Sequence, residues 1–153
     1  MNYSYKKITI DDIEFVQSVF KVKEYKDIFF EQNTSIKGWT QRLSAIKEFE
    51  IVFDGNNKIG VINVLNDDNC IKILLLSLKD KLRGKGIGTK IFNDLLSTYP
   101  NTRFELSVMK SNERAVKFYK KLKFIITKEF IEDYGDNGKH PSYEMVREEV
   151  VIK

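Results

Sequence analysis

Three glycines alternate with a cation and an apolar residue in one short segment, Arg83-Gly84-Lys85-Gly86-Ile87-Gly88. The segment follows an apolar, strand-like run and precedes a helix-like one. Because glycine has no side chain, its backbone N–H groups can come close to a ligand. The start of a helix adds free N–H groups and the positive end of the helix dipole. With the charges of Arg83 and Lys85, the segment predicts a socket for a phosphorylated ligand.

Two common phosphate-binding patterns do not fit this loop. A nucleoside-triphosphate loop that began at Gly84 would need Gly-Lys at positions 89 and 90, where the chain has Thr89 and Lys90. The dinucleotide fingerprint would also need glycine at position 89. What remains is Arg-x-x-Gly-x-Gly, formed by Arg83, Gly86 and Gly88. This pattern resembles the pyrophosphate loop of the GNAT superfamily of N-acetyltransferases, which bind acetyl-CoA there.

A second segment, at residues 112–124, resembles the other signature of the same superfamily, Asn-x-x-Ala-x-x-Phe-Tyr followed by a short run that ends in Gly-Phe. The matching residues are Asn112, Ala115, Phe118, Tyr119 and Phe124. Lys123 stands where the family has glycine, and a lysine in a left-handed turn there would cost free energy. Two linked motifs are far more specific than one.

The resemblance implies a role for each matched residue. The pyrophosphate of acetyl-CoA would be held by the backbone N–H groups of residues 84–89, which run from Gly84 through Ile87 and Gly88 to Thr89. The backbone of Leu76 and Leu78 would pair with the pantetheine arm and polarise the thioester carbonyl. Asn112 would cap a helix, hydrogen-bond the pantetheine arm, or do both.

Tyr119 is the candidate general acid, because a phenol with a pKa of about 10 can donate a proton to a forming thiolate. The alternative is that Tyr119 is a core residue of an amphipathic helix, as we expect for Phe118. The general base stays open between His140, which we place on the last turn, an acidic residue of the N-terminal half such as Glu24, Asp27 or Glu31, and ordered water.

The charges are unevenly distributed. Residues 79–123 hold 12 Lys and Arg against 4 Asp and Glu, whereas the rest of the chain is net acidic. A basic field over the two motifs would attract the phosphates of CoA, and the acidic remainder suits a cationic amine. A nucleic-acid-binding module is a weaker alternative, since exposed aromatic residues are not interleaved with the cations.

Composition excludes several other classes of protein. No apolar run approaches the length of a membrane span, and the N-terminal residues lack an apolar signal region. Cys70 is the only cysteine and His140 the only histidine, so we expect no internal disulfide and no metal site. These features predict a cytoplasmic protein that needs no metal.

The apolar periodicity predicts one α+β domain over residues 1–153. We expect strands at residues 5–10, 50–53, 59–65, 71–78, 103–109, 124–130 and 142–150. Helices are expected near residues 11–22, 39–49, 87–97 and 112–122. This order is that of the GNAT fold, a mostly antiparallel seven-stranded sheet flanked by about four helices.

The sequence therefore predicts an N-acetyltransferase that moves the acetyl group of acetyl-CoA to a primary amine by direct attack in a ternary complex. The acceptor is a small molecule, a peptide or a protein, and the chain itself does not choose among them. A CoA-binding or acyl-CoA-binding domain without turnover is the main alternative. Pairing through the last strands would give a homodimer.

Overall fold

The computed structural model describes residues 3–20, 48–133 and 138–148. Its strands are β1 (Tyr3–Lys7), β2 (Glu50–Asp54), β3 (Asn57–Asp67), β4 (Cys70–Leu78), β5 (Arg103–Met109), β6 (Ile125–Asp133) and β7 (Lys139–Arg147). Its α-helices in these ranges are α1 (Ile13–Phe20), α4 (Ile87–Thr98) and α5 (Glu113–Lys121). None of these described helices is long and apolar enough to cross a lipid bilayer.

The strands form one seven-stranded sheet in the order β1-β2-β3-β4-β5-β7-β6. β1 with β2, β2 with β3, and β7 with both β5 and β6 pair antiparallel, and β4 pairs parallel with β5. The mixed α+β class and the mostly antiparallel seven-stranded sheet are therefore confirmed. The described pairs between β4 and β5 cover only Cys70–Lys72 on β4.

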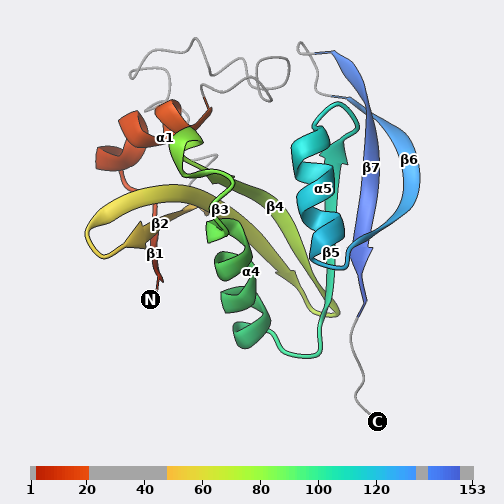
Figure 1. Ribbon diagram of the computed structural model, residues 1–153, viewed down its shortest axis with the longest axis horizontal. Coiled ribbons are helices and arrows are strands. Elements are labelled where there is room, and N and C mark those ends of the chain that lie inside the picture. Colours follow the sequence, from red (N-terminus) through yellow and green to blue (C-terminus); the bar gives the residue numbers. More distant parts are fainter. Residues whose placement is uncertain (1–2, 21–47, 134–137, 149–153) are drawn as a thin grey trace. The chain divides into compact units, whose positions relative to one another are not determined.

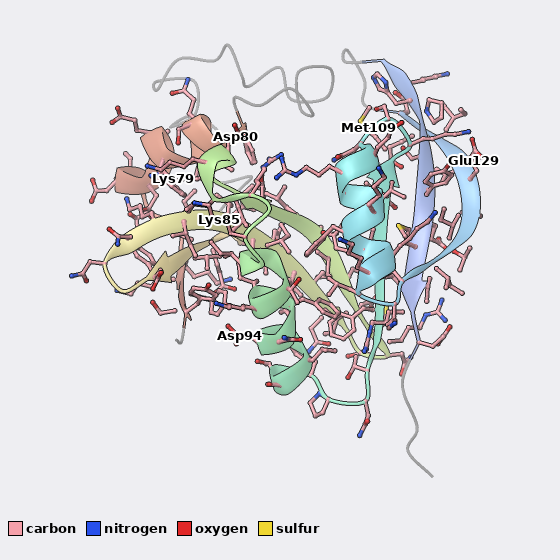
Figure 2. The ribbon with its side chains drawn as sticks, in the orientation of Figure 1. Lys79, Asp80, Lys85, Asp94, Met109 and Glu129 are labelled. Carbon is pink, nitrogen blue, oxygen red and sulfur yellow. The ribbon has the colours of Figure 1, made fainter. Side chains whose placement is uncertain are left out.

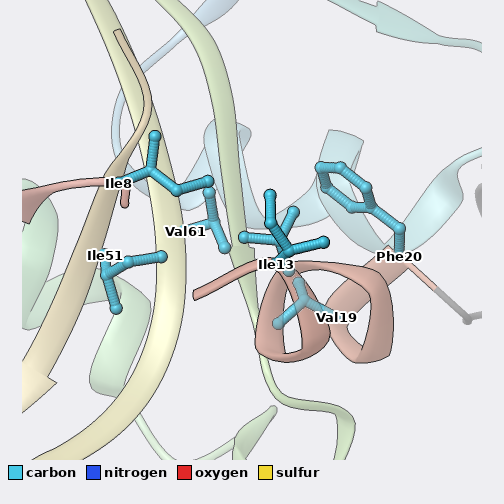
Figure 3. Packing of buried hydrophobic residues seen from close by; sticks show 7 residues of the cluster. Ile8, Ile13, Val19, Phe20, Ile51 and Val61 are labelled. Carbon is cyan, nitrogen blue, oxygen red and sulfur yellow. The ribbon is translucent and has the colours of Figure 1, made fainter. Parts of the chain in front are cut away.

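The described chain falls into two compact units, and each is taken here by itself. One comprises residues 1–63 and 75–88, and the other residues 64–74 and 89–153. In the first unit, α1 packs its apolar side against β2 and β3 (Figure 3). The buried cluster consists of Ile8, Ile13, Val16, Val19, Phe20, Ile51 and Val61. Burial of these side chains is the main stabilising term for this unit.

A buried carboxylate fixes the start of α1 in the same unit. Asp12 is 7% exposed, and its carboxylate lies 2.7 Å from the Lys58 ammonium on β3. The Thr9 backbone N–H also donates to it, at 2.8 Å. Burial alone would raise the pKa of Asp12, but the hydrogen bonds from Lys58 and Thr9 and the charge of Lys58 outweigh burial and lower the pKa. The ion pair thus ties the helix to the strand without an uncompensated charge.

In the second unit, aromatic rings from α4, from β5 and from the residues just after α5 pack together. Figure 1 labels these three elements. The Phe92 ring makes edge-to-face contacts with Phe104 at 5.3 Å and with Phe124 at 5.6 Å between ring centroids. The Arg147 guanidinium lies 5.6 Å from the Phe92 centroid, and its Nε donates to the Leu122 carbonyl at 3.0 Å. Arg147 therefore satisfies a carbonyl at the end of α5 while it covers the core.

The last hairpin corrects the sequence prediction. His140 was expected on the turn, but β7 begins at Lys139, and His140 pairs with Glu132 of β6. The hairpin is longer than expected because β6 continues to Asp133, and the residues before Pro141 pair with its last residues. β1 likewise begins earlier, at Tyr3, and ends at Lys7. The helix expected at 39–49 lies almost wholly outside the described residues, which resume at residue 48.

The end of α5 explains how Lys123 replaces a glycine. Lys123 has φ +75°, the left-handed conformation that favours glycine. Its N–H donates to the Lys120 carbonyl, and the Phe124 N–H donates to the Tyr119 carbonyl, both at 3.0 Å. These two bonds form a Schellman motif, and the Tyr119 and Phe124 rings, 5.4 Å apart, supply its apolar contact. The turn is therefore kept with lysine in the place of the family's glycine.

We predict that Lys123→Gly raises the free energy of unfolding by about 1 kcal/mol, because it removes the left-handed strain of a side chain. Lys120→Gly is the matched control. Lys120 lies three residues earlier, inside α5, where glycine should lower that free energy by about 1 kcal/mol. Urea unfolding of both variants measures the two signs. A loss of stability in Lys123→Gly would contradict this account of the turn.

Candidate acetyl-donor site

The loop between β4 and α4 has the conformation that its glycines predict. After β4 ends at Leu78, a 3₁₀ turn covers Asp80–Leu82, and α4 begins at Ile87. Gly84 has φ +76° and Gly86 has φ +81°. Side chains rarely adopt such angles, so glycine is required at both positions. An added Cβ at Gly86 would meet no atom within 4 Å, so its backbone faces open space.

The two cations of the loop differ in their surroundings. Lys85 is exposed, and Figure 2 shows it beside the loop with Lys79 and Asp80. The Arg83 side chain is only 12% exposed. One of its terminal nitrogens donates to Ser77 Oγ at 3.4 Å, and its Nε lies 4.0 Å from the Asp80 carboxylate. Arg83 therefore lies against the end of β4, and Lys85 is the cation of the pair that projects into solvent.

The backbone of Leu76 and Leu78 faces away from β3. The Lys79 N–H donates to the Ile59 carbonyl of β3 at 3.0 Å, and the Ser77 carbonyl oxygen would lie 2.7 Å from a Cβ on Gly60 of β3, so both groups point toward β3. Backbone groups alternate along a strand. Leu76 and Leu78 therefore direct theirs to the opposite edge of β4, where described pairing with β5 ends at Lys72. This is the edge to which an extended, amide-bearing ligand could add as a peptide adds to a sheet.

Gly60 on β3 permits the close approach that positions this end of β4. A Cβ at Gly60 would lie 2.7 Å from the Ser77 carbonyl oxygen and 2.9 Å from Leu78 Cδ2. Any side chain would therefore push the two strands apart. Neither Gly60 nor Ser77 stood out in the sequence, because a close contact between strands leaves no local pattern. The one available signal was a serine at the end of the otherwise apolar odd-numbered face of β4, Ile71, Ile73, Leu75.

Asn112 and Tyr119 lie on α5 in the second unit. Asn112 is the N-cap, and its side-chain oxygen accepts from the Ala115 N–H at 3.2 Å, so the capping role is confirmed. Tyr119 is buried at 8% exposure, and its ring packs edge-to-face on Phe118 and Phe124. Phe118, which the sequence placed in the core, is only partly buried. Thr89 is exposed in the first turn of α4.

The candidate general bases are only partly covered by the structure. His140 is half-buried on β7, and the Ser142 hydroxyl donates to its backbone carbonyl at 3.3 Å. Glu24, Asp27 and Glu31 lie outside the described residues. Across residues 3–20, 48–133 and 138–148, no group of three or more His, Cys, Asp and Glu side chains is arranged to hold a metal ion.

Comparison with known proteins agrees with this fold. The family model for the acetyltransferase (GNAT) domain matches residues 8–137. A search of curated proteins finds no match. Among solved structures, Ard1 from Thermoplasma volcanium is 22% identical with a TM-score of 0.68, over 99% of this chain and 100% of that one.

Two further structures contain CoA or a CoA analogue. Spermidine N-acetyltransferase from Vibrio cholerae, in complex with CoA and spermine, is 18% identical with a TM-score of 0.72, over 95% of this chain and 94% of that one. Naa50 from Arabidopsis thaliana, in complex with the bisubstrate analogue CoA-Ac-MVNAL, is 21% identical with a TM-score of 0.61, over 96% and 99%. At these identities the neighbours show a shared fold. Since the family model covers most of the chain, this protein belongs to the GNAT acetyltransferase family.

Proposed function

We propose that this protein is an acetyl-CoA-dependent N-acetyltransferase that transfers the acetyl group directly to a primary amine in a ternary complex. The observation that carries the proposal is the loop of Gly84 and Gly86, which leads from the end of β4 into α4 with two left-handed glycines. Membership of the GNAT family supports the same reaction class.

The residues of the loop fit a pyrophosphate chemically. Open space above Gly86 and the exposed Lys85 ammonium leave room and charge for an anion. The N–H groups of the first turn of α4, residues 87–90, have no partners within the helix, and the helix dipole favours negative charge there. We assign the backbone of residues 84–89 to the pyrophosphate of acetyl-CoA, with Lys85 as the nearest full charge.

The edge of β4 supplies hydrogen bonds for the rest of the donor. The backbone groups of Leu76 and Leu78 would pair with the amides of the pantetheine arm, and one of their N–H groups would polarise the thioester carbonyl. Asn112 uses its side-chain oxygen to cap α5, which leaves its amide N–H₂ to donate to a pantetheine carbonyl. Capping and ligand binding are therefore compatible in one side chain.

Tyr119 would donate its phenolic proton to the thiolate of CoA as the amine attacks. The match of Tyr119 to the second family motif supports this role, and its packing on Phe118 and Phe124 would hold the ring in one orientation. The incoming ammonium must also lose a proton. We assign that step to water or to His140, with Glu24, Asp27 and Glu31 as alternatives.

The acceptor is an amine, and two chemical classes deserve the first trial. One structural neighbour was solved with spermine and another with a peptide-bearing bisubstrate analogue. A polyamine carries several ammonium groups, whereas a peptide offers one terminal amine on an apolar body. The net acidic charge outside residues 79–123 favours a cationic acceptor of either class.

The proposal is tested by the amine-dependent release of CoA thiol from acetyl-CoA, measured with a thiol reagent. We expect at least one of spermine and a short Met-initiated peptide to accelerate release over the rate in buffer. Binding of acetyl-CoA without acceleration by any amine would instead favour the non-catalytic CoA-binding alternative.

We predict that Gly86→Ala weakens acetyl-CoA binding by about tenfold or more, because the new methyl group enters the space assigned to the pyrophosphate and strains the loop. Gly55→Ala is the matched control. Gly55 has φ +62° and also meets no atom within 4 Å of an added Cβ, but it lies in the turn between β2 and β3. Calorimetric titration should show near wild-type affinity for Gly55→Ala. Equal losses in both variants would contradict the loop assignment.

We predict that Tyr119→Phe lowers kcat by about tenfold or more with little change in the affinity for acetyl-CoA, since the ring stays and only the acidic proton is lost. Tyr99→Phe is the control, because Tyr99 follows the far end of α4 from the glycine loop. Steady-state kinetics of CoA release measure both. An unchanged kcat in Tyr119→Phe would assign this residue to packing alone.

A further inference from the structure

We propose that Ser77 and Arg83 are a pair of positioning residues that fix the end of β4 to the acetyl-donor loop. The inference rests on the proposed function, because it concerns the binding of the acetyl donor. Arg83 would act through Ser77 and the strand rather than as a direct phosphate ligand.

The first argument is the burial of Ser77. It is 3% exposed, whereas the positions that share its face of β4, Ile71, Ile73 and Leu75, are apolar. A buried hydroxyl costs free energy unless it is hydrogen-bonded. The Ser77 hydroxyl oxygen accepts a hydrogen bond from the Arg83 guanidinium, at 3.4 Å. Ser77 is therefore a polar residue in a buried position whose side chain contacts the loop.

The second argument is the restriction of Arg83. Its side chain is 12% exposed, and Asp80, in the 3₁₀ turn that opens the loop, lies 4.0 Å from its Nε. A guanidinium is planar and offers fixed donor directions, so contacts with Ser77 and Asp80 orient it along the strand end. Lys85, exposed and two residues on, is left as the cation that a phosphate can reach.

The third argument is what Ser77 joins. Its carbonyl faces Gly60, where an added Cβ would lie only 2.7 Å away, so β3 holds Ser77 from one edge. Its neighbours along β4 are Leu76 and Leu78, whose backbone we assign to the pantetheine arm. The hydrogen bond from Arg83 to Ser77 therefore links the glycine loop, which we assign to the pyrophosphate, to the strand end, which we assign to pantetheine.

The test separates the two parts of the donor. Acetyl-CoA carries the pyrophosphate, and S-acetylpantetheine lacks it. Dissociation constants for both compounds are measured by titration of the wild type, Ser77→Ala, Arg83→Ala, the double variant and Lys85→Ala. Urea unfolding of each variant corrects for any loss of folded protein.

We expect Ser77→Ala and Arg83→Ala each to weaken both compounds by about tenfold, the loss typical of a hydrogen bond to a charged group. The double variant should lose no more affinity than the single variant with the larger loss, because the two residues act through one contact. Lys85→Ala should weaken acetyl-CoA alone. Arg83→Lys, which keeps the charge but not the fork of donors, should resemble Arg83→Ala.

Three results would overturn the inference. Arg83→Ala could weaken acetyl-CoA alone, which would make Arg83 a phosphate ligand. The losses from Ser77→Ala and Arg83→Ala could add in the double variant, which would make the residues independent. If the wild-type protein bound neither compound, the proposed function itself would be refuted, and this inference with it.

Discussion

The candidate acetyl-donor site depends on how closely β3 approaches the end of β4. Gly60 has no side chain where a Cβ would lie 2.7 Å from the Ser77 carbonyl oxygen. This contact lies next to the last residue of β4, Leu78. The Ser77 carbonyl and the Lys79 N–H point toward β3, and the backbone groups of Leu76 and Leu78 point to the opposite edge. The 3₁₀ turn and the glycine loop follow this contact directly, so the backbone that we assign to the ligand is positioned by the packing of two strands.

At the end of α5, a single residue takes part in several interactions. Tyr119 is at once the third residue from the helix end, a member of an aromatic cluster and the residue whose carbonyl accepts from Phe124. A side chain held in this way has little conformational freedom left to lose, which suits the proton donor that we propose Tyr119 to be. The strained Lys123 shows that the turn is kept even without the family's glycine. The geometry of the Schellman motif is thus maintained at a cost in stability.

Sequence alone predicted what depends on local chemistry. The glycines at 84 and 86, the cap at Asn112 and the left-handed turn at Lys123 each follow from the conformational demands of single residues. The strand at Arg103–Met109 was predicted with its observed bounds, because its apolar alternation is uninterrupted. The whole sheet class followed from the order of such segments and from the resemblance of two motifs to a family.

The sequence could not predict what depends on contacts between distant segments. Gly60 and Ser77 are separated by a hairpin, and only the pairing of β3 with β4 brings them together. Arg83 looked like a free cation until the strand end beside it was known. His140 was placed on a turn because Gly138 and Pro141 flank it, whereas the ladder with β6 runs past Pro141 and His140 to Lys139. In each case a tertiary contact outweighed the local pattern.

The most direct test of the central claim is thermal unfolding of the protein with and without acetyl-CoA. A ligand that binds the native state raises the free energy of unfolding by RT ln(1 + [L]/Kd), about 2.7 kcal/mol at a hundredfold excess over Kd. The account predicts a clear rise in Tm that saturates with concentration. An unchanged Tm at millimolar acetyl-CoA would contradict it.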